Sequence, residues 1–187
     1  MTEISEIRQT EEMQDDLTLL KEMIGSAMFF SSPSEYSILI EEKLKHCTCW
    51  DFVRIVDYDA KKGSFVGRVL PYRQEGVFLD FYSFNSPVIQ AISRTTGYIK
   101  RDLTIPTDEM YERKLQAEGI RTVCLSPIIT RDSFMGVVIG YLKKNAEVTK
   151  RDEKILETTA EIVAIAQEIF TNRCILSEMA KKIENYH

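Results

Sequence analysis

The chain has 187 residues, a length that suits one domain with helical extensions better than two compact domains. Hydrophobic residues make up 44% and charged residues 28%, as in soluble globular proteins that bury a core without disulfides. The net charge is −5, and lysines and arginines are scattered among carboxylates. A nucleic-acid partner would require a concentrated basic face, so we expect none.

The sequence also argues against a membrane location. No apolar run approaches the roughly 20 residues that cross a bilayer, and the start "MTEISEIRQTEEMQDD" is polar, unlike a signal peptide. We therefore expect a cytoplasmic protein with no membrane partner. Its four cysteines, Cys47, Cys49, Cys124 and Cys174, should then be reduced thiols.

Two helices are predicted at the start of the chain. Between residues 5 and 30 apolar residues recur at helical spacing: Met13, Leu17, Leu20, Ile24 and Ala27. The motif "SSPSEY" predicts a second helix, with Ser32 as its cap and Pro33 at its first position. That helix should end near "KHCTC".

The middle of the chain changes to strand periodicity. The runs "WDFVRIVDYD" and "SFVGRVL", joined by the turn "AKKG", predict a hairpin. The aromatic segment "PYRQEGVFLDFYSFNSP" predicts a long loop, whose part "VFLDFYSFNSP" we expect to be more mobile than the sheet. Ser86 and Pro87 open a short helix, "YIKRDL" is a strand, and "TDEMYERKLQAEG" is a helix capped by Thr107.

The last part of the chain predicts a second hairpin and a long helix. Two apolar runs flank a polar break in "EGIRTVCLSPIITRDSFMGVVIGYLKKN", and a helix follows from Thr149 to about Asn185. Along this helix one apolar set recurs every seven residues: Ile155, Ile162, Ile169, Leu176 and Ile183. The repeat predicts a parallel homodimer through the terminal helices. In the alternative that stays open, the terminal helices of one chain pack only on each other.

The order of these elements resembles the GAF domain family over about residues 26–173. Two segments carry the resemblance. One is the segment after residue 118, and the other, which precedes it, is a helix followed by a glycine, a strand and an aspartate. The matching residues are Gly97, Asp102, Gly119, Ile120, Thr122, Pro127, Gly136, Gly140, Thr149 and Asp152.

This resemblance implies an α+β fold, an α/β/α sandwich. A central antiparallel sheet of about five to six strands would be covered by helices, with long N- and C-terminal helices. We expect an N-terminal amphipathic helix over residues 1–30 and a GAF domain over residues 31–173. The C-terminal helix, residues 149–187, would project at its end as a coiled coil.

The resemblance also implies a small-molecule pocket between the sheet and its cover. The expected ligand-binding residues are Phe78, Asp80, Phe81, Tyr82, Tyr98, Asp102, Tyr111, Arg121, Cys124 and Ser126. Simpler roles stay open: the aromatic cover closes the core, Asp102 caps a turn, Arg121 bonds the last carbonyls of a helix, and Cys124 is a small buried hydrophobe.

We expect no metal, haem or bilin cofactor. Cys47-x-Cys49 lacks the four ligands of a zinc or iron–sulfur site, and His46 and His187 are the only histidines. The Cys-His pair of bilin-carrying relatives is absent.

The expected function is a non-enzymatic sensory module. It would bind an unidentified small ligand and signal, as a homodimer, to an output domain or protein. One alternative is a thiol enzyme resembling free methionine (R)-sulfoxide reductase. The others are a redox-sensing domain and a purely structural dimerisation domain.

Overall fold

We analysed a computed structural model of the chain. It describes residues 2–30, 32–67, 82–83, 85–94, 97–131, 133–143 and 146–184.

The centre of the fold is an antiparallel sheet, which has five strands among the described residues, in the order β2-β1-β5-β4-β3. The strands are β1 (Phe52–Asp59), β2 (Ser64–Gly67), β3 (Ile99–Asp102), β4 (Thr122–Thr130) and β5 (Ser133–Leu142). Strands β4 and β5 form the predicted second hairpin, with Cys124 opposite Gly140. Both strands are apolar on both faces because layers cover the sheet on both sides.

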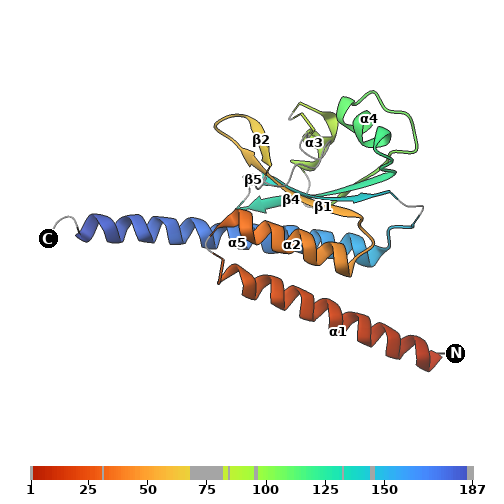
Figure 1. Cartoon of the computed structure of the whole chain (residues 1–187), viewed down its shortest axis with the longest axis horizontal. Coiled ribbons are helices and arrows are strands. Elements are labelled where there is room, and N and C mark those ends of the chain that lie inside the picture. The colour runs from red at the N-terminus through yellow and green to blue at the C-terminus, as the bar shows by residue number, and fades with distance from the viewer. Residues whose placement is uncertain are drawn as a thin grey trace.

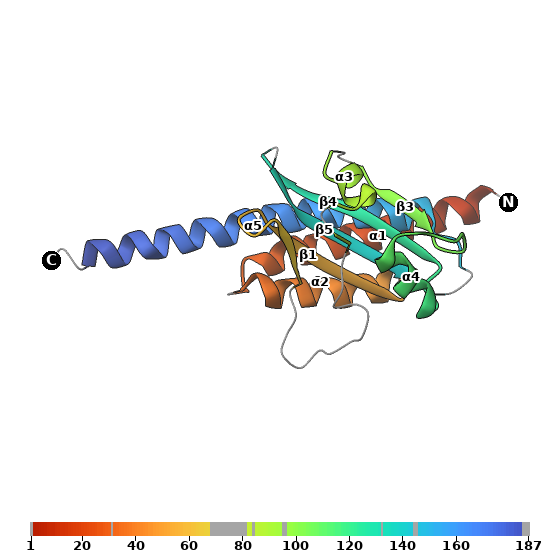
Figure 2. The same ribbon diagram turned by 90° about the horizontal axis from the view of Figure 1, so that it is seen from above.

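Helices form the two outer layers (Figure 1). On one face lie α1 (Thr2–Ala27), α2 (Pro33–Cys47) and α5 (Lys150–Glu184). The short helices α3 (Pro87–Ile92) and α4 (Met110–Ala117) lie on the other face, as the view from above shows (Figure 2). An α+β fold with helices around an antiparallel sheet is thereby confirmed. Within the described residues, no helix is long and apolar enough to cross a membrane.

The local signals for the helices were mostly right. Ser32 accepts a hydrogen bond from the Glu35 amide and Ser86 one from the Val88 amide, as N-caps do. Helix α4, however, begins at Met110 and has no side-chain cap. Thr107 instead accepts a bond from the Glu109 amide in the preceding loop.

Side chains of alternating strand residues form one core on each face of the sheet. The core under α1, α2 and α5, which we call the helix face, contains Met23, Tyr36, Trp50, Cys124 and Leu156. The core under α3 and α4, which we call the cover face, contains Tyr82, Ile89, Leu115, Val123 and Tyr141. The cover face is where the family resemblance predicts a ligand.

Two strand glycines are required by close neighbours. A Cβ on Gly140 would lie 2.5 Å from Cδ2 of Trp50, so the indole occupies the space of the missing side chain. Gly136 has φ +153°, and its Cβ would lie 2.1 Å from the carbonyl oxygen of Val56 on β1. Trp50 and the neighbouring strand β1 therefore occupy the space beside these glycines.

The seven-residue repeat of α5 does not form one exposed stripe. Ile155 and Ile162 are only 4% and 5% exposed and lie in the helix-face core, against which Ile169 also packs. Leu176 and Ile183 are 65% and 61% exposed, and this part of α5 projects beyond the sheet (Figure 1). Assigning all five residues to a partner helix was therefore wrong, because a helix packed on a sheet needs the same apolar spacing.

Helix α1 is fastened to α5 near its middle and just after its C-terminal end. The Arg151 guanidinium forms a forked pair with Asp16, with Nη2 2.6 Å from Oδ1. Arg173 donates to the carbonyl oxygens of Met28 at 2.7 Å and Phe30 at 3.3 Å. The two terminal helices of one chain are thus in direct contact.

Candidate functional site on the cover face

A buried carboxylate lies at the centre of the polar groups on the cover face. Glu112 on α4 is fully buried and accepts four hydrogen bonds. Oε1 accepts from Tyr82 Oη at 2.9 Å and from Arg101 Nε at 2.8 Å. Oε2 accepts from Arg101 Nη2 at 3.1 Å and from Thr107 Oγ1 at 2.6 Å. Glu112 therefore joins α4 to strand β3, to Thr107 and to Tyr82 before α3.

The electrostatics of the cluster favour a charged Glu112. Burial alone would raise the pKa of Glu112, but the bonds from Arg101, Thr107 and Tyr82 outweigh it and lower that pKa below its usual 4.5. The bond to Glu112 in turn raises the pKa of Arg101. Burial, and then the charge of Glu112, raises the pKa of Tyr82, so its hydroxyl stays a donor.

Three tyrosines lie together in the cover-face core, and one of them, Tyr82, donates to this carboxylate. The hydroxyls of Tyr111 and Tyr141 are 2.8 Å apart, and the rings of Tyr82 and Tyr111 meet edge to face with centroids 4.7 Å apart. All three side chains are buried. A few hydroxyl and charged groups in an apolar, aromatic setting are typical of sites that orient a small molecule.

A second aromatic group lies on strands β1, β2 and β5. Tyr58, Phe65 and Phe134 have ring centroids 5.5 to 6.2 Å apart and are half-buried. Phe65 and Phe134 pack against the cover-face core. This part of the cover face is apolar and suits the flat, hydrophobic part of a ligand.

The structure brings together two of the ten expected ligand-binding residues, Tyr82 and Tyr111. Phe78, Asp80 and Phe81 lie outside the described residues. Among the others, Tyr98 donates to Glu153 of α5 at 2.6 Å. This bond directs the Tyr98 hydroxyl toward the helix face and raises its pKa to about 12.

Two further expected residues have structural roles at the ends of strands. Asp102 accepts bonds from the Thr104 amide at 2.9 Å and from its hydroxyl at 2.6 Å, which makes the turn after β3. Arg121 is exposed, and its backbone pairs with Leu142 and Leu103.

Cys124 and Ser126 do not belong to this site. Both are buried and share one side of β4, because alternate strand residues point the same way, and Cys124 lies in the helix-face core. Expecting Cys124 and Ser126 to line the pocket was therefore wrong. Val123 and Leu125 of the same strand face the cover instead. Alternation shows which residues share a face, but not which layer that face meets.

Sequence reasoning missed Glu112, Arg101 and Tyr141. Glu112 follows Tyr111 and precedes Leu115 by three residues on α4, so the helical period places it beside two apolar residues that face the core. Arg101 lies on a short edge strand with no distinctive pattern. Tyr141 ends an apolar strand and therefore looked like an ordinary core residue.

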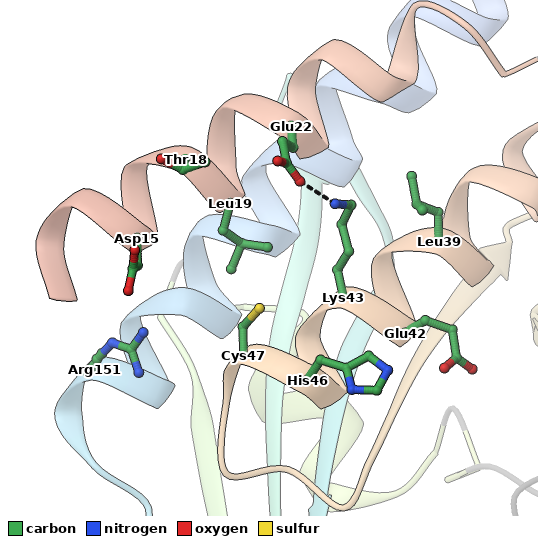
Figure 3. A pocket seen from close by; sticks show the side chains of 10 residues that line it. All are labelled: Asp15, Thr18, Leu19, Glu22, Leu39, Glu42, Lys43, His46, Cys47 and Arg151. Carbon is green, nitrogen blue, oxygen red and sulfur yellow. Dashed lines mark hydrogen bonds and ion pairs between the residues drawn. The ribbon is translucent and has the colours of Figure 1, made fainter. Parts of the chain in front are cut away.

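The helix face carries a groove of about 670 Å³ between α1, α2 and the start of α5 (Figure 3). Leu19 points into it from α1 and Cys47 from α2, and an ion pair between Glu22 and Lys43 crosses it. Lys43 of α2 and Arg151 of α5 each form an ion pair with a carboxylate of α1, and these two ion pairs hold α1 against the other two helices. A smaller groove of about 340 Å³ lies between α5 and the β4–β5 turn, bordered by Arg131, Gln167 and Asn172.

The four cysteines differ in exposure, and the two more buried thiols are poor nucleophiles. Cys47 and Cys174 are exposed, whereas Cys49 is half-buried and Cys124 buried. Burial raises the pKa of Cys124 to about 12, and burial together with the charge of Asp152 does the same for Cys49. Over the described residues, no three His, Cys, Asp or Glu side chains converge in a way that could hold a metal ion.

Helices thus cover both faces of the antiparallel sheet in an α/β/α arrangement. A family model described as "GAF domain" matches residues 40–167, most of the chain. The chain belongs to the GAF domain family, whose members are small-molecule sensory and regulatory modules.

Solved structures agree on the fold. The GAF domain of a phosphoenolpyruvate-protein phosphotransferase from Coxiella burnetii is 13% identical with a TM-score of 0.67, covering 87% of this chain and 98% of its own. A GAF domain assigned to a sensor histidine kinase from Pseudomonas syringae pv. tomato is 12% identical with a TM-score of 0.66, covering 94% and 98%.

An enzyme also shares the fold. Free methionine-R-sulfoxide reductase from Neisseria meningitidis, solved with its substrate, is 16% identical with a TM-score of 0.61 and covers 83% of this chain and 89% of its own. A search of curated proteins finds no match. Identities this low support the fold alone.

Proposed function

We propose that the chain is a non-enzymatic sensory and regulatory module. It binds a small ligand on the cover face and signals through its terminal helices in a homodimer. The observation that carries this proposal is the continuity of α5. Its first half is buried against the sheet, and its second half projects beyond the domain as the same helix. A shift in packing at the sheet is therefore transmitted to the projecting end.

The cover face supplies the ligand-binding groups in this proposal. Tyr82, Tyr111 and Tyr141 offer hydroxyls and ring faces, while Glu112 and Arg101 hold the cluster in place. A ligand with an apolar ring system and one or two hydrogen-bonding groups matches this lining. Tyr82 couples the site to the expected cover, because it directly follows Phe78, Asp80 and Phe81 in sequence.

Exposed apolar side chains favour dimer formation. Leu176, Met179 and Ile183 are exposed on the projecting part of α5, and burying each would contribute about 1–2 kcal/mol. Two chains together then gain about 6–12 kcal/mol, comparable with the cost of association.

Helix α1 can add to the same interface. Its exposed apolar residues Leu17 and Ile24 lie on a different flank from Thr18 and Glu22, which face α2, and Met28 is exposed just after its end. In a dimer, the α1 and α5 helices of both chains can then form a four-helix bundle.

In this proposal α5 passes the signal to an output domain or protein. The support is the relative assigned to a sensor histidine kinase. Because the chain has a net charge of −5, we propose a cytoplasmic module that has neither nucleic acid nor a membrane as partner.

Light scattering on a charge variant tests the dimer. Ile169 packs on the core, so the variant changes exposed positions only: Leu176→Glu with Ile183→Glu. We expect a folded monomer, because carboxylates cannot be buried in the interface. The matched control, Cys174→Glu with Ser177→Glu, adds the same charge to other exposed positions and should remain a dimer. A dimer that survives the first change would place the interface elsewhere.

The positions of the thiols favour this proposal over a sulfoxide reductase. A thiol-dependent reductase needs at least two cysteines over the cover face. Cys124 lies in the helix-face core, Cys49 packs against the same core, and Cys47 lines the groove between α1 and α2. Thiol-dependent turnover of free methionine sulfoxide by the purified protein would overturn the non-enzymatic proposal.

A further inference from the structure

One side of α5 carries a regular series of residues that are exposed except for Ile169, which packs against the edge of the core. We call it the α5 seam, and it consists of Ile165, Ile169, Asn172, Leu176, Met179 and Ile183. The steps between them alternate between four and three residues, which is the a/d spacing of a two-stranded coiled coil. All except the half-buried Ile169 are exposed.

The seam is distinct from the side of α5 that packs on the sheet. Helical geometry directs Val163, Ala166 and Phe170 into the helix-face core, on the other side of the helix from Ile165 and Leu176. On one flank Arg173 contacts the end of α1. The opposite flank borders the groove at the β4–β5 turn. The seam therefore runs between α1 and that turn and continues along the projecting part of the helix.

We propose that a second copy of this chain lies along the α5 seam as a parallel, in-register coiled coil, and that Asn172 sets the register. This inference rests on the proposed dimer and specifies its geometry. In a parallel pair in register, each seam residue meets the same residue of the second copy. Asn172 then meets another amide, and each offers the donor and the acceptor that the other needs.

The composition of the seam identifies the occupant. Its apolar members alone would tolerate a shift by one heptad or an antiparallel arrangement. A symmetric antiparallel overlap of residues 165–183 places Asn172 opposite Leu176, which leaves a buried amide without a partner. A heptad shift has the same effect. Only a second copy in parallel register satisfies Asn172 while burying Leu176, Met179 and Ile183.

Disulfide trapping tests the register in the full chain. In a Cys47→Ser background, Met179→Cys places a thiol within the seam, whereas the native Cys174 lies on the outer side of the helix. We expect mild oxidation to link most Met179→Cys chains into covalent dimers, while the parent with Cys174 alone remains largely unlinked. A dimer by light scattering in which Met179→Cys fails to link would overturn the parallel seam and leave the proposed dimer intact. A monomeric parent would overturn both.

A second variant tests the role of Asn172. In the Met179→Cys protein, Asn172→Leu removes the amide and should raise the midpoint of thermal unfolding, because an apolar residue replaces a buried polar one. We expect the linked fraction to fall to about half or less, since shifted and antiparallel pairs become accessible. An unchanged linked fraction with a single dimeric mass would show that Asn172 does not set the register.

Discussion

Arg101 on the edge strand β3 holds Glu112 of α4 through two hydrogen bonds, with Nε 2.8 Å from Oε1 and Nη2 3.1 Å from Oε2. The same carboxylate accepts from Tyr82. One side chain thus fixes the relative position of a strand, a helix and the segment that leads into α3.

Replacing Glu112 with glutamine should destabilise the domain. The glutamine amide leaves Arg101 without its charged partner. It also replaces one acceptor oxygen with an amide nitrogen, a donor that would face the donor groups around it. Breaking a buried ion pair costs about 3–5 kcal/mol, and we expect the lower end because the Arg101 side chain is 43% exposed. Urea unfolding at neutral pH measures the loss. Glu118→Gln, a matched change at an exposed position, should have little effect, and equal stability of the two variants would contradict this role.

The stability of the protein should also depend on the charge of Glu112. Its pKa is lowered by folding, so its contribution is fully present above the usual value of 4.5 and is lost as the pH falls below that value. Between about pH 6 and about pH 3, wild type should lose more unfolding free energy than Glu112→Gln. Parallel profiles of the two proteins would show that the carboxylate is not stabilised in the folded state.

The four thiols should react unequally. Iodoacetamide at about pH 8 is expected to modify the exposed Cys47 and Cys174 within minutes. It should spare Cys49 and Cys124, whose pKa values are both raised to about 12. Peptide mass spectrometry identifies the modified sites, and labelling in urea provides the full count of four. Rapid native labelling of Cys124 would contradict its burial.

Adding one methyl group at Gly140 should damage the packing of Trp50. The new Cβ would lie within 3 Å of three indole carbons, which forces the ring to move and costs about 1–3 kcal/mol or more. Gly25→Ala, in α1 with no atom within 4 Å, is the matched control and should stabilise by about 0.5–1 kcal/mol. Trp50 is the single tryptophan, so its fluorescence reports the displacement directly. An unshifted spectrum in Gly140→Ala would contradict the contact.

The sequence predicted the layers of the fold better than the site. Period-two and helical spacing, with caps such as Ser32 and Ser86, are local signals, and they identified the hairpins and helices. The site depends on contacts between distant segments. Glu112 and Arg101 are 11 residues apart and lie in different elements, so no local pattern predicts their pairing.

The two main errors have the same physical origin. Periodicity shows which residues share a side of a strand or helix, but not what lies against that side. Cys124 was therefore assigned to the pocket although it faces α5, and Ile155 and Ile162 to a partner although they fill the chain's own core. Only burial in the folded structure distinguished these cases.

We propose above that this GAF domain binds a small molecule as a dimer. Native mass spectrometry of protein purified from its own source tests it most directly. We predict the mass of a dimer with one non-covalent small molecule per chain, released by unfolding in acid. Tyr111→Phe, which removes one hydroxyl from the cover face, should retain the dimer and lose most of the adduct. A bare mass for the wild-type protein, whether monomer or dimer, would contradict the account.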